Sequence, residues 1–161
     1  MEPASKTKAL LLVEDDPVYA QFILSVIEKS GLPLKLFHVA NLEQGLAYVQ
    51  GDEPYADRAA YPMPAIVLLD IILGTDSGFP LLRWLREHGH LAHEQIRVVM
   101  LTASSGTENV QEALRLGALS YVVKSPSAEN VLNLLAKLLL DPPKLPPPAS
   151  GPGNQSARPQ L

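Results

Sequence analysis

Residues 8–16 read KALLLVEDD and decide the fold of this chain. The apolar run in their middle is short and unbroken, which is typical of a β-strand covered on both faces. Glu14, Asp15 and Asp16 stand where that strand ends. Asp16 precedes Pro17 and suits the N-cap of a helix whose first residue is proline. The stretch therefore predicts the first strand–helix unit of an α/β domain.

The same unit recurs along the chain, because short apolar runs alternate with segments whose apolar residues have helical spacing. Five strands alternating with five helices predict βαβ units and a doubly wound parallel sheet with helices on both faces. The expected strands are Ala9–Val13, Leu34–Val39, Ala65–Leu69, Arg97–Leu101 and Ser120–Val123. The expected helices cover residues 17–30, 41 to about 50, 78–88, 107–116 and 127–140. Asn41, with Gln44 three residues later, resembles a capping box at the start of the second helix.

Proline marks the irregular parts of the chain. The sequence has 15 prolines in 161 residues, and seven of them fall in the last 21. Residues 51–64 contain three more and show no apolar period, so they form a long loop, typical of a functional or inserted segment. We expect a flexible N-terminus over 1–7, one domain over 8–140 and a disordered proline-rich tail over 141–161. A polyproline ligand is the alternative interpretation of the tail.

Composition excludes several classes of protein. Thirteen basic against 17 acidic residues give a net charge of −4 without a dense basic cluster, which disfavours a nucleic-acid partner. The absence of cysteine excludes a disulfide scaffold, a thiol nucleophile and cysteine-based zinc sites. The apolar run near the N-terminus is too short for a signal peptide, and no apolar stretch could span a membrane. We expect a cytoplasmic protein.

Polar residues follow four of the five expected strands, at the sheet edge where α/β proteins place their sites. Glu14 and Asp15 follow the first strand, Asp70 the third, Thr102 the fourth and Lys124 the fifth. Singly, each has a plainer role as a cap, a turn residue or a solvated lysine. Together, carboxylates this close require a cation, and a hard divalent ion such as Mg²⁺ suits their oxygen ligands.

Five motifs carry a family resemblance: VEDD, VLLD, a glycine eight residues after Asp70, LTA, and a lysine 22 residues after Thr102. Together they resemble the receiver (CheY-like) domain of bacterial two-component response regulators, over about residues 8–140. The resemblance implies the flavodoxin-like strand order 2-1-3-4-5. It also implies that Asp70 accepts a phosphoryl group from a sensor histidine kinase. Lys124 would pair with the phosphoryl oxygens, Thr102 would turn its hydroxyl onto them, and Tyr121 would be the aromatic switch residue.

The resemblance further implies a Mg²⁺ site. Glu14 and Asp15 resemble the family's acidic pair, and Asp15 is expected to bind Mg²⁺ beside Asp70 and the backbone carbonyl of Ile72. Ile72 and Ser104 stand where family members vary to set the phosphoryl lifetime. Because a bulky apolar Ile72 hinders the attacking water, we predict slow autodephosphorylation.

Two stretches depart from the family pattern. Leu73-Gly74 replaces the usual Met-Pro, which predicts a looser loop after the phosphoacceptor. Lys124-Ser125-Pro126 replaces Lys-Pro, which leaves open whether the Lys124–Ser125 peptide is cis. This variant and the long 51–64 loop resemble the stand-alone receivers that partner with bacteriophytochrome-type kinases.

The last helix, ENVLNLLAKLLL, is apolar around most of its circumference. Leu132, Leu139 and Leu140 exceed what one core needs, so we predict that they form a homodimer interface. A deeply buried helix is the alternative.

The sequence thus predicts a single-domain response regulator that is phosphorylated with Mg²⁺, is not an enzyme in the usual sense, and signals through protein contact. One alternative is a dimerisation scaffold that is never phosphorylated. Another is a Mg²⁺-dependent aspartyl-phosphate phosphatase, but such enzymes carry a second aspartate where this chain has Ile72.

Overall fold

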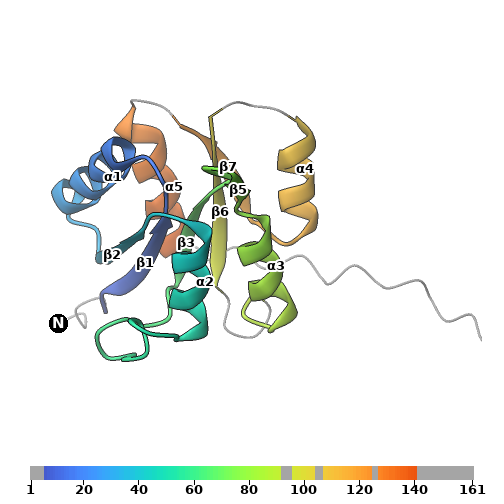
Figure 1. Cartoon of the computed structure of the whole chain (residues 1–161). Helices are drawn as coiled ribbons and strands as arrows, with labels where there is room; N and C mark the ends of the chain where they lie inside the picture. Colours follow the sequence, from blue (N-terminus) through green and yellow to red (C-terminus); the bar gives the residue numbers. More distant parts are fainter. Residues whose placement is uncertain (1–5, 92–95, 104–106, 125–126, 141–161) are drawn as a thin grey trace, which may run out of the picture.

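A five-stranded parallel sheet forms the centre of the computed structural model, which describes residues 6–91, 96–103, 107–124 and 127–140 (Figure 1). The strand order is β2-β1-β3-β6-β7. The strands are β1 (Lys8–Val13), β2 (Leu34–Val39), β3 (Ile66–Asp70), β6 (Arg97–Thr102) and β7 (Ser120–Val123). Since β6 and β7 are the fourth and fifth strands of this sheet, the predicted order 2-1-3-4-5 is confirmed.

Helices cover both faces of the sheet (Figure 1). On one face lie α1 (Pro17–Ser30) and α5 (Ala128–Leu140). On the other face lie α2 (Leu42–Gln50), α3 (Phe79–Glu87) and α4 (Thr107–Arg115). Among the described residues, none of these helices has both the length and the apolar character needed to cross a membrane.

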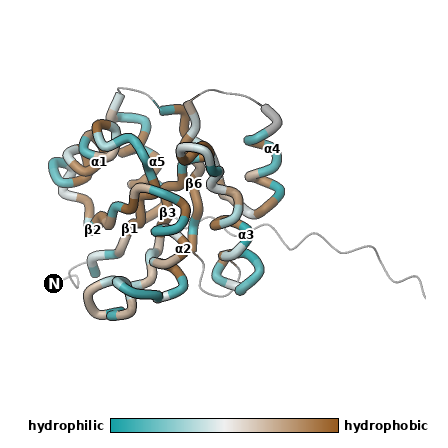
Figure 2. The backbone as a smooth tube through the Cα atoms, viewed as in Figure 1, coloured by the Kyte–Doolittle hydropathy of each residue, from teal (hydrophilic) through white to brown (hydrophobic). Residues whose placement is uncertain are grey.

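Alternation along β1 builds two separate cores. Leu10 and Leu12 point to the core under α1 and α5, whereas Leu11 and Val13 point to the core under α2 and α3. All four side chains are fully buried, and Figure 2 shows the hydrophobic strands in the middle of the molecule, surrounded by helices of mixed hydropathy. The unbroken apolar run is therefore explained by a strand with no solvent-facing side.

The predicted helix starts carry the expected caps. Asp16 Oδ1 accepts a hydrogen bond of 2.9 Å from the amide of Val18. Asn41 Oδ1 accepts one of 2.8 Å from the amide of Gln44. The Gln44 side chain in return accepts from the amide of Ala40, one residue before the cap. These bonds satisfy amides that a helix leaves unpaired in its first turn.

The predicted loop over residues 51–64 contains no helix or strand, but it is packed closely against α2. The rings of Tyr55 and Tyr61 lie 5.1 and 6.0 Å from the buried ring of Tyr48. The Arg58 guanidinium donates hydrogen bonds of 2.7 and 2.9 Å to two carbonyls in the last turn of α2. Arg58 thus caps a helix C-terminus, where a cation is favourable.

The segment after Asp70, which the sequence predicts to be a looser loop, contains two short strands. β4 (Ile72–Leu73) and β5 (Asp76–Ser77) pair antiparallel in a small hairpin that the sequence did not predict. Gly74 makes its turn with a φ of 64°, which glycine adopts without strain. Its amide also donates a 3.1 Å hydrogen bond to Asp15 Oδ2, which ties the hairpin to the end of β1.

Some predictions fall outside the described residues. These are the residues of the N-terminus up to 5, the tail over 141–161, Ser104 and the Lys124–Ser125 peptide.

Candidate functional site

A cavity of about 270 Å³ lies at the carboxyl ends of the parallel strands. This is the edge to which the sequence assigned the site. The cavity is lined by Asp15, Asp70, Ile71, Ile72, Thr102, Ala103, Asn109 and Lys124. Glu14 lies beneath it and is fully buried.

Lys124 links the carboxylates of two other strands. Its Nζ lies 2.6 Å from Asp70 Oδ2 and 2.8 Å from the Glu14 carboxylate. Its backbone amide donates a 2.7 Å hydrogen bond to the carbonyl of Thr102. Glu14 and Asp70, which lie 110 and 54 positions before Lys124 in the sequence, therefore meet at its ammonium group.

Burial and hydrogen bonding shift the pKa values of Glu14 and Lys124. Desolvation raises the pKa of Glu14 from 4.5 to about 7, although its bonds to Lys124 and to the amide of Asp16 oppose the rise. Burial alone would lower the pKa of Lys124, but the hydrogen bonds from its ammonium to Asp70 and Glu14 leave that pKa raised. Lys124 therefore stays charged at neutral pH and compensates the carboxylates around it.

Three carboxylates converge in a way that suits a metal ion. Glu14, Asp15 and Asp70 each place a ligand oxygen within 4.8 Å of the others. Asp15 is exposed, whereas the other two are buried. A set of oxygen ligands with one face open to solvent suits Mg²⁺, which keeps several of its waters. The residues present thus fit a divalent cation.

The geometry around Asp70 explains the glycine eight residues later. Gly78 is the N-cap of α3, and its amide donates a 2.9 Å hydrogen bond to the carbonyl of Ile71. A Cβ atom there would overlap the Asp70 carbonyl oxygen and lie 2.9 Å from Leu69 Cγ. Its φ of −75° is open to any residue, so space rather than backbone conformation requires glycine. Asp70 Oδ1 meanwhile accepts a 3.1 Å bond from the amide of Ile72.

The remaining predicted residues surround the cavity at different depths. Thr102 is buried at the end of β6, and Ile72 is 61% exposed on the cavity wall. Tyr121, the expected switch residue, lies on the edge strand β7 with 42% of its surface exposed.

Two residues near the site are not predicted from the sequence. Asn109 reaches the cavity from α4, and nothing in its local sequence distinguishes it from any exposed helix residue. Tyr19 falls on the apolar stripe of α1 and reads as a core residue, yet its ring centroid lies 5.3 Å from Lys124 Nζ.

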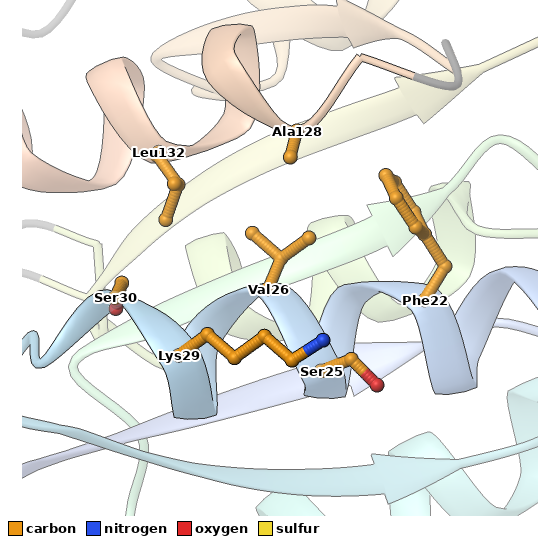
Figure 3. A pocket seen from close by; sticks show the side chains of 7 residues that line it. All are labelled: Phe22, Ser25, Val26, Lys29, Ser30, Ala128 and Leu132. Carbon is orange, nitrogen blue, oxygen red and sulfur yellow. The ribbon is translucent and has the colours of Figure 1, made fainter.

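The structure corrects one prediction for α5. Leu139 packs against the core between the sheet and α1, so it is not surplus. Leu140 is 86% exposed, and Leu132 is half-buried. Leu132 and Ala128 of α5 face Phe22 and Val26 of α1 across a groove of about 330 Å³ (Figure 3).

Solved structures with the same fold include response regulators of phytochrome systems. The bacteriophytochrome response regulator RtBRR is 31% identical, with a TM-score of 0.70 over 88% of this chain and 85% of that one. Response regulator RPA3017 in red light signaling of R. palustris is 27% identical, with a TM-score of 0.74 over 86% of this chain and 98% of that one.

Curated relatives and a family model agree with this likeness. The transcriptional regulatory protein GltR of Pseudomonas aeruginosa is 30% identical over 132 residues, which are 82% of this chain and 49% of GltR. The photosynthetic apparatus regulatory protein RegA of Rhodobacter capsulatus is 28% identical over 145 residues, 90% of this chain and 68% of RegA. The chain thus spans about half the length of relatives such as GltR. The family model of the response regulator receiver domain matches residues 10–136, so the chain belongs to the receiver domain family of response regulators.

Proposed function

We propose that residues 8–140 act as a response regulator receiver that takes a phosphoryl group onto Asp70 from a sensor histidine kinase. The observation that carries the proposal is the bond from Lys124 Nζ to Asp70 Oδ2 inside an open cavity. A carboxylate held beside a fixed cation is prepared both to attack phosphorus and to keep the charged product.

The transfer needs little covalent chemistry from the protein. A carboxylate oxygen of Asp70 attacks the phosphorus of the donor phosphohistidine, and the P–N bond breaks with its electron pair going to the imidazole nitrogen. The Ile72 amide orients Asp70 through its bond to Oδ1, and Lys124 follows the negative charge onto the phosphoryl oxygens. The Thr102 side chain, which lines the cavity, then hydrogen-bonds the bound phosphoryl group.

Mg²⁺ is part of this proposal. Asp15 and Asp70 would hold it together with the Ile72 carbonyl, and Glu14 completes the acidic cluster. When bound, the ion supplies positive charge to the transferring oxygens. The hydrogen bond from the Gly74 amide keeps Asp15 directed toward the cluster.

Acetyl phosphate tests the proposal directly. With Mg²⁺ and acetyl phosphate, the intact protein should gain the mass of one phosphoryl group, and chelation of Mg²⁺ should prevent the gain. Asp70→Asn should abolish it. Asp16→Asn is the matched control, because asparagine preserves the helix cap and the residue lies outside the cavity lining.

No mass gain in the wild type, with acetyl phosphate or with a phosphorylated kinase, would favour the dimerisation scaffold instead. The phosphatase alternative is weaker. Its second acidic residue would fall at Ile72, whose exposed aliphatic side chain cannot transfer a proton.

We also propose a phytochrome-type histidine kinase as the partner. The support is that RtBRR, described as a bacteriophytochrome response regulator, and RPA3017, described as acting in red light signaling, share the fold at 31% and 27% identity. A phosphorylated bacteriophytochrome kinase should transfer its phosphoryl group to this chain faster than an unrelated histidine kinase does. Equal rates would contradict this choice of partner.

A further inference from the structure

Tyr19 contacts the ammonium group on which the proposed transfer depends. Its ring centroid lies 5.3 Å from Lys124 Nζ, within the range of a cation–π interaction. Tyr19 comes from the first turn of α1, directly after the acidic end of β1. Residues at the carboxyl ends of β1, β3 and β6, together with Tyr19 of α1, thus surround Lys124.

The Tyr19 ring is itself held in place. It is half-buried against the core beneath α1 and α5. It packs on Phe22 with a centroid distance of 5.8 Å and an interplanar angle of 42°. Phe22 in turn lines the groove between α1 and α5 (Figure 3). A ring fixed in this way can restrict the lysine that lies against it.

Lys124 needs such a restriction. Its side chain is about 20% exposed and has four rotatable methylene groups, so it can swing toward solvent. The carboxylates of Asp70 and Glu14 hold the ammonium in this structure, but during transfer Asp70 becomes an acyl phosphate and Lys124 Nζ has to pass from the Asp70 oxygen to the phosphoryl oxygens. An aromatic face attracts a cation without neutralising it, and its contribution persists while the ammonium changes its anionic partner.

We propose that Tyr19 is a positioning residue, whose ring keeps Lys124 Nζ over Asp70 during phosphoryl transfer. The inference rests on the proposed function, because it assigns Tyr19 a part in that transfer. It differs from a packing role in one respect: an aliphatic side chain of similar size would fill the core but would offer the ammonium no π face.

Three substitutions at Tyr19 distinguish a positioning role from a packing role. Tyr19→Phe keeps the ring, whereas Tyr19→Leu and Tyr19→Met keep apolar volume without it. We expect the maximal rate of phosphorylation by acetyl phosphate to fall about threefold to tenfold in the Leu and Met variants. It should return to near the wild-type rate in Tyr19→Phe. The KM for acetyl phosphate and the Kd for Mg²⁺ should not change, because Tyr19 belongs neither to the cavity lining nor to the carboxylate cluster.

A spectroscopic readout reports the contact without any phosphorylation. Protons on the Lys124 methylene next to Nζ should be shifted upfield by the ring current in wild type and Tyr19→Phe, and should lose that shift in the Leu and Met variants. The signal is assigned by its disappearance in Lys124→Arg. Thermal unfolding of each variant checks that the fold is retained, and the Met variant serves if the Leu variant is unstable.

The outcomes distinguish this inference from the proposed function. If the wild type is phosphorylated on Asp70 and both aliphatic variants react at the wild-type rate, the positioning role is overturned and the phosphoacceptor role stands. An unshifted Lys124 signal in the wild type would also overturn it. If the wild type takes no phosphoryl group, both ideas fail together.

Discussion

Gly78 packs directly against the backbone of Asp70, and the space beside it is too small for the methyl group of an alanine. Gly78→Ala should destabilise the fold by about 1–3 kcal/mol, because the new Cβ overlaps the Asp70 carbonyl oxygen and crowds Leu69. It should also slow phosphorylation by displacing Asp70. Urea unfolding gives the first effect, and the acetyl phosphate assay gives the second.

Gly45 provides the matched control for that substitution. It lies within α2, and a Cβ there would meet the flexible end of Leu81 at 3.2 Å. Helix propensity favours alanine by about 1 kcal/mol, which offsets the crowding, so Gly45→Ala should be nearly neutral. Equal losses of stability in the two variants would contradict the special role of Gly78.

Ile72 should set how long the phosphoryl group survives. Its aliphatic side chain is 61% exposed on the cavity wall, where we expect it to hinder a water approaching Asp70. Ile72→Asn replaces that barrier with a group that can orient water, so dephosphorylation should become several-fold faster. The decay of the phosphorylated protein after removal of acetyl phosphate measures this rate. An Ile72→Asn variant that keeps its phosphoryl group as long as the wild type would refute the predicted role of Ile72.

At the scale of elements, the loop over 51–64 and α2 should give the protein a marked sensitivity to alkali. Burial raises the pKa of Tyr48 from 10.0 to about 12, and its hydroxyl donates a 2.9 Å bond to the Pro62 carbonyl. Between these two pH values the folded protein keeps a proton that the unfolded chain has lost. The free energy of unfolding should therefore fall as the pH rises from 10 towards 12.

Tyr48→Phe tests that dependence. Phenylalanine cannot ionise, so the variant should be less stable than the wild type at neutral pH, through loss of the hydrogen bond, but should lose less stability across the alkaline range. Urea unfolding at a series of alkaline pH values measures both slopes. Parallel slopes would show that Tyr48 does not cause the alkaline loss.

Local sequence signals predicted the elements that depend on them. The unbroken apolar runs gave the sheet, and Asp16 and Asn41 marked helix starts that the structure confirms. The β4–β5 hairpin was missed because its strands of two residues are too short for any period. The packing of the 51–64 loop was missed as well, since its cap on α2 depends on one arginine whose partners are backbone carbonyls.

At the scale of the whole molecule, a homodimer remains our prediction, now with fewer interface residues. Leu140 is 86% exposed at the end of α5, and Leu132 borders the groove, whereas Leu139 belongs to the core. Sedimentation equilibrium at tens of micromolar protein should give the mass of a dimer. Leu140→Glu should shift it toward the monomer, and Lys137→Glu, an exposed change on the same helix, should not. A monomeric wild type, phosphorylated or not, would contradict the prediction.

The sequence was enough to predict which residues form the candidate site, but not which contacts they make with one another. Parallel strands bring their carboxyl ends together, so the positions of Glu14, Asp70 and Lys124 in the sequence were enough to place them at one edge. The sequence holds no signal that the lysine bonds both carboxylates, or that Tyr19 lies against it, because those contacts depend on side-chain directions in three dimensions.

The separation of 110 residues between Glu14 and Lys124 has a consequence for synthesis. A ribosome delivers the chain from its N-terminus, so Glu14, Asp15 and Asp70 emerge well before the last strand does. Until β7 joins the sheet, these carboxylates have no lysine between them and repel one another. The bonds that join Lys124 to Glu14 and Asp70 can therefore form only after β7 has been synthesised.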